Sequence, residues 1–288
     1  MTSSEGWSVT TTAPAKLNLT LRVVGTRPDG FHELDALTVT VAAPADELTI
    51  AAGPAGTVAL TVANGGAEVP PGEDNLVVRA ARAVLAPGAG VRIALTKVTP
   101  TGAGLGGGSA DAAAVLRILR DRFDLDAATV MAAAADLGSD VPVCVDGHPV
   151  RLRGRGEVLE PVELAGALHV VIATPGFALA TPDVFRAWDA LGGTGRPRTV
   201  AAPAAVAHLV PDLVNDLEPA AERVAPEITA FRDALAGVAG AEPMLAGSGS
   251  SYWFAVADAE TATFVAARVR DELSVRTFAG RVLRGAPG

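Results

Sequence analysis

A run of glycines that leads into a helix-forming pattern is the feature of this sequence most suggestive of chemistry. Five of the seven residues from 102 to 108 are glycine, and apolar residues recur at helical spacing from Ala112 onward. Glycine has no Cβ, so such a loop can approach a ligand closely and point its N–H groups at phosphate oxygens beside a helix dipole. We expect Ser109 to cap the helix and Asp111 to lie in its first turn. The pattern predicts a loop that binds the phosphates of a nucleotide.

The spacing of the glycines distinguishes this loop from three known types. Gly102, Gly104 and Gly107 fit G-x-G-x-x-G, but no second strand ending in an acidic residue follows, as a Rossmann unit requires. A Walker loop has a lysine after its last glycine, and a protein-kinase loop runs into a strand. What remains is a lysine-free loop that begins a helix, with a flexible linker as the structural alternative.

Two further segments place polar groups where they could meet a ligand. Lys16 lies in an apolar strand pattern, where a buried ammonium without a partner would cost free energy, and Asn18 faces the same side of that strand. A Gly-Ser segment follows at residues 247–251. The structural alternatives are polar residues of an edge strand for the first segment and a hairpin turn for the second.

Taken in order, residues 13–21, 100–109 and 245–251 resemble the three motifs of the GHMP kinase superfamily. Finer features resemble the branch that phosphorylates 4-diphosphocytidyl-2-C-methyl-D-erythritol in the non-mevalonate isoprenoid pathway; they lie at 27–34, 136–142, 154–157, 181–185 and 215–219. The resemblance covers roughly residues 9 to 284. The sequence departs from the pattern at Phe31, where many members have tyrosine, at 147–150, and at Tyr252-Trp253.

The resemblance implies an ATP-dependent kinase that phosphorylates the 2-hydroxyl of this substrate. Asp140 would be the general base, and Lys16 would favour its ionised form and stabilise developing charge. Asn18 would orient the hydroxyl. The structural alternative for Asp140 is a turn-capping aspartate.

The cofactors implied are ATP and Mg²⁺, whose protein ligands the sequence does not identify. Ser109 could offer its hydroxyl to the metal ion, although helix capping would also explain this residue. The expected ATP-binding residues are Pro100, Gly102, Ala103, Gly104, Leu105, Gly106, Gly107, Gly108, Ser109 and Ala110.

The resemblance also implies a cytidine subsite, in which Phe31 and Phe185 sandwich the base and His32 hydrogen-bonds to its edge. The turn of Gly247, Ser248 and Gly249 would close over the substrate phosphates. Core packing is the alternative for each phenylalanine, and a structural role is the alternative for His32.

Composition limits the other possibilities. A net charge of −9 and the absence of an extended Lys/Arg patch argue against general nucleic-acid binding. A single cysteine, Cys144, excludes an internal disulfide, and its apolar neighbours predict a core position. The first residues lack a basic start followed by a long apolar stretch, and no uninterrupted apolar run reaches about 18 residues. We therefore expect a cytoplasmic protein, monomer or homodimer, that does not bind a membrane.

Strand and helix patterns occur in mixed order, which predicts an α+β fold. We expect two domains, residues 1–163 and 164–288; the resemblance implies a ribosomal-protein-S5-like domain and a ferredoxin-like domain with the active site between them.

Another GHMP alcohol kinase, acting on mevalonate, homoserine or a sugar, is the nearest alternative function. A catalytically silent ligand sensor of the same fold is a further alternative function, although Lys16 and Asp140 argue against it.

The expected strands are 9–23, 33–41, 48–50, 58–62, 91–97, 141–145, 149–153, 168–173, 242–246, 251–257 and 274–284, and the expected helices are 75–85, 109–122, 126–137, 181–191, 200–208, 225–236 and 258–271.

Overall fold

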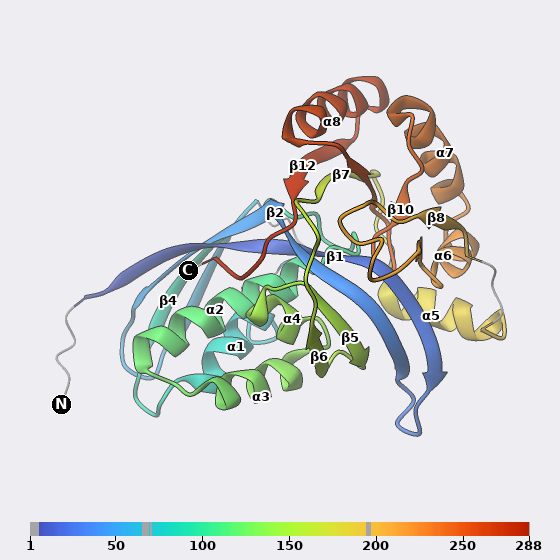
Figure 1. The fold of residues 1–288 in the computed structure, drawn as a ribbon. Helices are drawn as coiled ribbons and strands as arrows, with labels where there is room; N and C mark the ends of the chain where they lie inside the picture. Colours follow the sequence, from blue (N-terminus) through green and yellow to red (C-terminus); the bar gives the residue numbers. More distant parts are fainter. Residues whose placement is uncertain (1–5, 65–68, 70, 194–196, 288) are drawn as a thin grey trace.

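A computed structural model describes residues 6–64, 69, 71–193 and 197–287. The chain forms a mixed helix and sheet structure around two main sheets (Figure 1), which confirms the predicted α+β class. The larger sheet has the order β3-β4-β2-β5-β6 with β1 paired to β2, and the smaller has the order β10-β11-β7-β12. The strands are β1 (Ser8–Thr26), β2 (His32–Ala52), β3 (Val58–Ala63), β4 (Val91–Thr96), β5 (Val150–Gly154), β6 (Val158–Pro161), β7 (His169–Thr174), β8 (Thr199–Ala201), β9 (Asp212–Val214), β10 (Met244–Leu245), β11 (Tyr252–Val256) and β12 (Arg276–Arg281).

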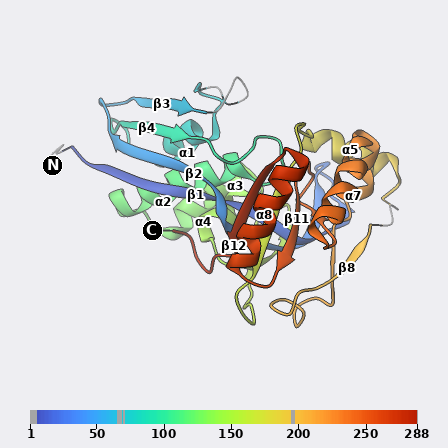
Figure 2. The ribbon, with the colours of Figure 1, turned by 90° about the horizontal axis from the view of Figure 1, so that it is seen from above.

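The helices fall into two groups, one beside each main sheet, and two views at right angles agree on this (Figures 1 and 2). The first four accompany the larger sheet, and the last four lie with the smaller one. They are α1 (Leu76–Val84), α2 (Gly107–Phe123), α3 (Ala127–Leu137), α4 (Val141–Asp146), α5 (Thr181–Ala190), α6 (Glu218–Val224), α7 (Glu227–Ala239) and α8 (Ala259–Leu273). Among the residues described, no helix is long and apolar enough to cross a membrane. The predicted domain boundary near 164 falls between β6 and β7 and stays a prediction.

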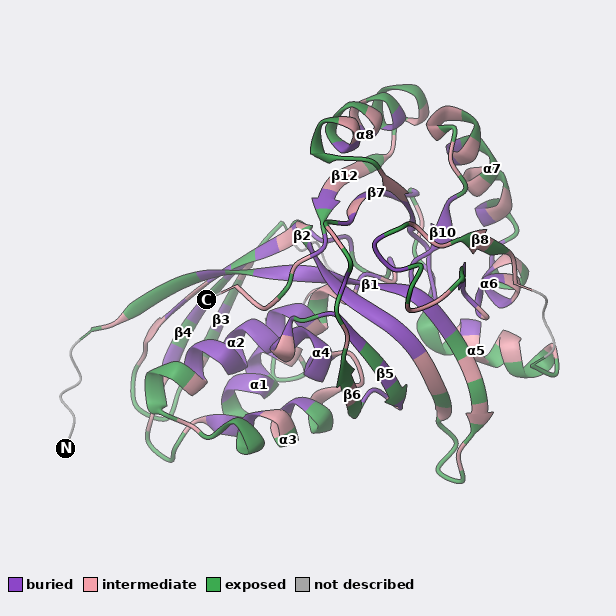
Figure 3. Ribbon diagram, in the orientation of Figure 1, coloured by how far each residue is buried: buried purple, intermediate pink, exposed green. Residues whose placement is uncertain are grey.

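The β1–β2 ribbon passes through the centre of the molecule, where β1 is buried on both faces (Figure 3). Leu17 and Leu19 pack into a core cluster with β7 and the smaller sheet. Because side chains alternate along a strand, Lys16 and Asn18 point to the opposite face. The register shifts on either side of this pair, but Lys16 still pairs with Thr40 and Asn18 with Thr38. The ribbon therefore carries two polar side chains into an otherwise apolar centre.

Two predicted elements are wrong. Residues 141–145 form the helix α4 and not a strand, because a fully buried apolar run lacks the alternation that separates the two, and Pro142 suits the first helical turn. Residues 200–208 form no helix but the short strand β8 followed by turns that begin near Pro203. The strands expected at 33–41 and 48–50 are parts of the single strand β2, and β6, β9 and α6 were not predicted.

Candidate active site

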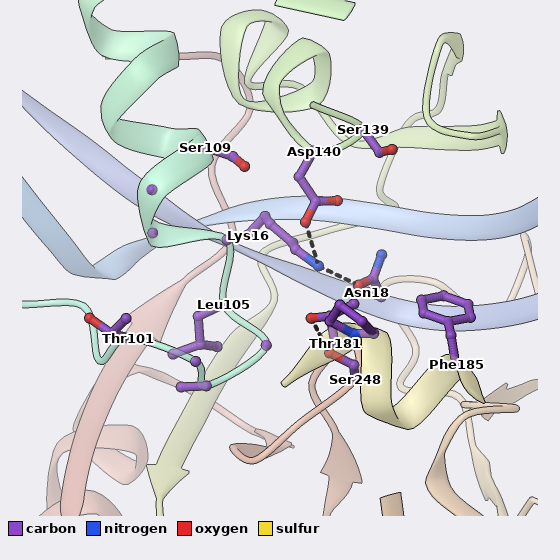
Figure 4. Close-up of a pocket in the computed structure, with 18 of the residues that line it drawn as sticks. Lys16, Asn18, Thr101, Leu105, Ser109, Ser139, Asp140, Thr181, Phe185 and Ser248 are labelled. Atoms are coloured by element: carbon purple, nitrogen blue, oxygen red, sulfur yellow. Dashed lines mark hydrogen bonds and ion pairs between the residues drawn. The ribbon is translucent and has the colours of Figure 1, made fainter. Parts of the chain in front are cut away.

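A single cavity of about 920 Å³ brings together the three motifs (Figure 4). It is bounded by β1, by residues 99–109, by the approach to α4, by the tip of the β1–β2 hairpin, by α5 and by the turn after β10. Of the predicted site residues, all but Ala110 and Gly249 line it. Ala110 is packed in the core on the buried side of α2, and a Cβ on Gly249 would face the apolar side chains of Leu179 and Leu245.

The centre of the cavity holds an ammonium beside a carboxylate. Lys16 Nζ lies 3.3 Å from Asp140 Oδ2 and donates a hydrogen bond of 2.8 Å to Asn18 Oδ1 (Figure 4). Asn18 Nδ2 in turn donates to Thr38 Oγ1. The Lys16 side chain is 6% exposed, whereas that of Asp140 is 35% exposed. Asp140 lies at the start of α4 but its side chain makes no capping hydrogen bond. The structure therefore contradicts the turn-capping interpretation of Asp140 and leaves a carboxylate open to the cavity.

The glycine loop is shaped by close backbone packing. Gly104 has φ +76°, and a Cβ there would lie 1.9 Å from the carbonyl oxygen of Ala246. Gly106 has φ +66°, and a Cβ there would lie 2.7 Å from Cγ of Lys16. Both positions disfavour any side chain. The loop is thus held against Lys16 on one side and against the turn after β10 on the other, while its backbone lines the cavity.

The start of α2 differs from the prediction. The helix begins at Gly107 with Gly106 as its N-cap, so Ser109 lies inside the first turn and does not cap it. Ser109 has the side chain best suited to capping, but it follows three consecutive glycines. The first of them, Gly106, adopts a left-handed conformation and caps the helix three residues earlier, so the prediction failed. The Ser109 hydroxyl is left free of a capping role at the edge of the cavity.

Asp111 also differs from the prediction, since it lies beyond the first turn and is 2% exposed. Lys97 Nζ donates to Asp111 Oδ2 at 2.7 Å and to Asp46 Oδ2 at 2.5 Å. Burial raises the pKa of Asp111 to about 8, against the opposing effect of Lys97 and with a further contribution from Asp46. The two carboxylates raise the pKa of Lys97 in spite of its burial. The loop itself has no lysine, but Lys97 at the end of β4 lines the cavity beside it, a residue that the sequence analysis missed.

The turn after β10 is held from behind by a residue to which no role was assigned. Asn215 is 1% exposed, and its Nδ2 donates to the carbonyl oxygens of Leu245 (2.9 Å) and Gly247 (2.7 Å). At the cavity side, the hydroxyls of Ser248 and Thr181 lie 2.8 Å apart (Figure 4). The Asn-Asp-Leu-Glu-Pro segment was the available signal, and its first residue proves to fix this turn.

The aromatic side chains at the far end of the cavity already have planar partners. The His32 and Phe185 rings are stacked, with centroids 4.7 Å apart, and the Arg155 guanidinium lies 3.6 Å above the Phe31 ring centre. Phe31 is 49% exposed, which contradicts core packing for this residue. Phe185 also packs against the core cluster that includes Leu217 and Ile228, so the base sandwich stays a prediction. Arg155 lines the cavity as well and was missed, although its Gly-Arg-Gly-Glu segment was recognised.

Cys144 and the unusual Tyr252-Trp253 pair have structural roles. Cys144 is buried in α4, as predicted, and burial raises the pKa of its thiol to about 12. Tyr252 and Trp253 are fully buried in β11. These positions therefore belong to the core rather than to the cavity.

The chain is similar to known proteins of one kinase family. Residues 75–148 match the family model described as GHMP kinases N terminal domain. The chain is 40% identical to 4-diphosphocytidyl-2-C-methyl-D-erythritol kinase of Pelotomaculum thermopropionicum, over 95% of this chain and 99% of the relative. It is 42% identical to the protein of that name from Azorhizobium caulinodans, over 89% and 92%.

Solved structures agree with the sequence relatives. A crystal structure of 4-(cytidine 5'-diphospho)-2C-methyl-D-erythritol kinase superposes with a TM-score of 0.77 at 33% identity, covering 97% of this chain and all of the other. Homoserine kinase from Cytophaga hutchinsonii, at 20% identity and a TM-score of 0.70, covers 98% of this chain and 96% of its own and shares the fold.

The fold and the glycine-lined cavity thus define an ATP-dependent GHMP kinase. Within this class, the chain belongs to the 4-diphosphocytidyl-2-C-methyl-D-erythritol kinase family, as the motifs indicated.

Proposed function

We propose that this protein transfers the γ-phosphoryl group of ATP to the 2-hydroxyl of 4-diphosphocytidyl-2-C-methyl-D-erythritol, in the non-mevalonate isoprenoid pathway. The observation that carries the proposal is a single cavity in which the Lys16–Asp140 pair lies between a glycine loop and an aromatic cluster. A phosphoryl transfer of this kind needs a held triphosphate, an aligned hydroxyl and a proton acceptor. Each has a candidate in that cavity.

Asp140 is proposed as the proton acceptor. Its carboxylate is open to the cavity and forms an ion pair with the nearly buried Lys16 ammonium, 3.3 Å away. As the hydroxyl oxygen attacks the γ-phosphorus, Asp140 takes the hydroxyl proton and the bond from the γ-phosphorus to the β-γ bridging oxygen breaks to release ADP. Lys16 also stabilises charge that develops on the attacking oxygen. Asn18, held by Lys16 and Thr38, fixes the direction of the ammonium and offers its amide edge to the hydroxyl.

The glycine loop is proposed to hold the triphosphate through backbone N–H groups at the start of α2. The described residues contain no group of three or more His, Cys, Asp or Glu side chains suited to a metal ion. Two oxygen donors nevertheless fit Mg²⁺, which binds through few protein oxygens together with phosphate oxygens and water. They are the hydroxyl of Ser109 and the buried Oδ1 of Asp111, which has no hydrogen-bond partner among the described residues. When bound, Mg²⁺ would neutralise charge on the transferring oxygens.

The cytidylyl group is proposed to occupy the aromatic end of the cavity. Phe31 and Phe185 offer flat faces for stacking, and His32 lies beside Phe185 with an edge for hydrogen bonding. The turn at Gly247 and Ser248 lies next to the glycine loop, where it can contact substrate phosphates. A mevalonate or homoserine kinase would have no use for this aromatic end.

The test is a coupled assay of ADP release with 4-diphosphocytidyl-2-C-methyl-D-erythritol, mevalonate and homoserine as separate acceptors. We expect turnover with the cytidylyl substrate and only background release with the other two. Equal or faster turnover of mevalonate or homoserine would refute the proposed acceptor, and no turnover of any acceptor would favour the ligand-sensor alternative.

A further inference from the structure

The Gly-Arg-Gly-Glu segment at residues 154–157 forms the tight turn between β5 and β6. Its second glycine, Gly156, is buried and has φ +122°. A Cβ on Gly156 would lie 2.1 Å from the carbonyl oxygen of Ser139 and 2.9 Å from the carbonyl carbon. Because both are backbone atoms, no rotation of a side chain makes room for it. The turn therefore packs directly against the residue that precedes Asp140.

The position of Asp140 depends on this part of the backbone. Ser139 and Asp140 lie next to each other at the start of α4 (Figure 4). The Asp140 side chain makes no capping hydrogen bond, and its ion pair with Lys16 spans 3.3 Å. Residues 137–140, which join α3 to α4, are only partly buried, whereas residues 141–145 are buried. A displacement of the Ser139 carbonyl therefore moves the Asp140 carboxylate.

The turn itself is held in place from the side of the larger sheet. β5 pairs with β2 and β6 pairs with β5, so both strands that flank the turn belong to that sheet. Glu157 accepts a hydrogen bond of 2.5 Å from the backbone N–H of Arg155 and one of 3.2 Å from the guanidinium of Arg27, which follows β1. The turn is thus the better fixed of the two segments, and the connection at Ser139 is the one that would yield.

We infer that Gly156 is a positioning residue that sets the place of the Asp140 carboxylate through its contact with the Ser139 carbonyl, and that Glu157 keeps the turn in shape for this contact. The inference rests on the proposed function, in which Asp140 takes the hydroxyl proton. Non-bonded heavy atoms rest about 3.5 Å apart, so a Cβ at 2.1 Å would force the two segments apart by about 1 Å. Misplacement of a reacting group by about 1 Å can lower a rate about a hundredfold.

The first test replaces Gly156 by alanine. We expect kcat at saturating substrates to fall by roughly ten- to a hundredfold, while ATP affinity in calorimetry stays unchanged because the glycine loop lies on other elements. Gly88→Ala is the matched control. Gly88 also has a positive φ, +83°, but a Cβ there would meet nothing within 4 Å. The control should lose stability in urea unfolding, as alanine at positive φ does, and keep its kcat.

A double-mutant cycle with Asp140→Asn separates positioning from a general structural role. If Gly156 acts through the base, Gly156→Ala should leave the residual kcat of Asp140→Asn unchanged, because no base remains to be displaced. A structural role would lower kcat by the same factor in both backgrounds. A crystal structure of Gly156→Ala should also show the Asp140 carboxylate displaced relative to Lys16 Nζ, with the glycine loop in place.

Glu157→Ala tests the same turn without placing a Cβ at the contact. The Glu157 side chain is 42% exposed, so this variant should fold. Loss of its two hydrogen bonds loosens the turn, and we expect kcat to fall about fivefold when Asp140 is present and not at all in Asp140→Asn. Glu160→Ala is the matched control, since Glu160 forms an exposed ion pair with Arg153 on the same pair of strands, and it should keep the wild-type kcat.

The outcomes separate the inference from the function on which it rests. A folded Gly156→Ala protein with wild-type kcat, equal losses in both backgrounds, or an unmoved Asp140 in its crystal structure would overturn the inference and leave the proposed kinase activity in place. If Gly156→Ala does not fold, an additive or absent effect of Glu157→Ala would overturn it as well. A near-normal kcat of Asp140→Asn alone would refute the proposed base, and the inference with it.

Discussion

Replacement of Asp140 by asparagine tests the proposed chemistry most directly. General-base catalysis contributes roughly 10²- to 10⁴-fold to rate, or about 3–5 kcal/mol of barrier, and asparagine cannot accept the proton. The variant should keep its fold, because Lys16 retains its hydrogen bond to Asn18 and the Asp140 carboxylate is already 35% exposed. A partner 3.3 Å away and partly solvated contributes about 1 kcal/mol to stability. We therefore expect kcat to fall by at least about a hundredfold with a small loss of stability.

The assay for this variant combines ADP release, urea unfolding and calorimetric titration with ATP. ATP affinity should change little, since the triphosphate is assigned to the glycine loop and not to Asp140. Asp136→Asn, an exposed change near the end of the adjacent helix α3, is the matched control and should retain full activity. A folded Asp140→Asn protein with near-normal kcat would refute the assignment of the base.

Three other substitutions test separate parts of the site. Phe185→Ala should weaken the cytidylyl substrate about tenfold through lost stacking and leave ATP binding unchanged in calorimetry; equal losses for both ligands would contradict the stacking role. Gly104→Ala should cost at least about 2 kcal/mol in urea unfolding, because its Cβ would lie 1.9 Å from the Ala246 oxygen at φ +76°; an unchanged midpoint would disprove this packing. Burial raises the pKa of Asp111 from 3.8 to about 8, so its folded form keeps a proton that the unfolded chain has lost within this range. The contribution of the protonated Asp111 to stability is thus complete below the unfolded pKa and is lost as pH rises through 8. Asp111→Asn should therefore flatten the fall in unfolding free energy between about pH 4 and 8. An unaltered slope would argue against a buried protonated Asp111.

Much of the site was predictable because it depends on local pattern. The glycine loop, the strand that carries Lys16 and Asn18, and the helix around Phe185 have clear periodicity or composition, and the structure places them around one cavity. The strand-to-helix error at 141–145 has a physical cause. When every residue of a short apolar run is buried, neither period 2 nor period 3.6 is visible, and tertiary packing decides.

The remaining site residues depend on contacts that link distant parts of the chain. Lys97 meets Asp46 from 51 residues away, and Asp189 meets His32 from 157 residues away. Asp111 has the sequence context of an ordinary first-turn acid. Because α2 begins two residues earlier than expected and Lys97 lies beside it, Asp111 is instead a buried hydrogen-bond partner of Lys97. No spacing rule relates such pairs, so the sequence alone could not assign them.

The contacts to His32 and the other site residues lie on different elements of the chain, which has an implication for engineering. Among the described residues, the ring contacts and the carboxylate contact of His32 come from α5, while the glycine loop and the Lys16–Asp140 pair belong to other elements. We therefore expect a library confined to residues 181–190 to vary the preference for the nucleoside part of the acceptor alcohol while leaving the Lys16–Asp140 pair in place.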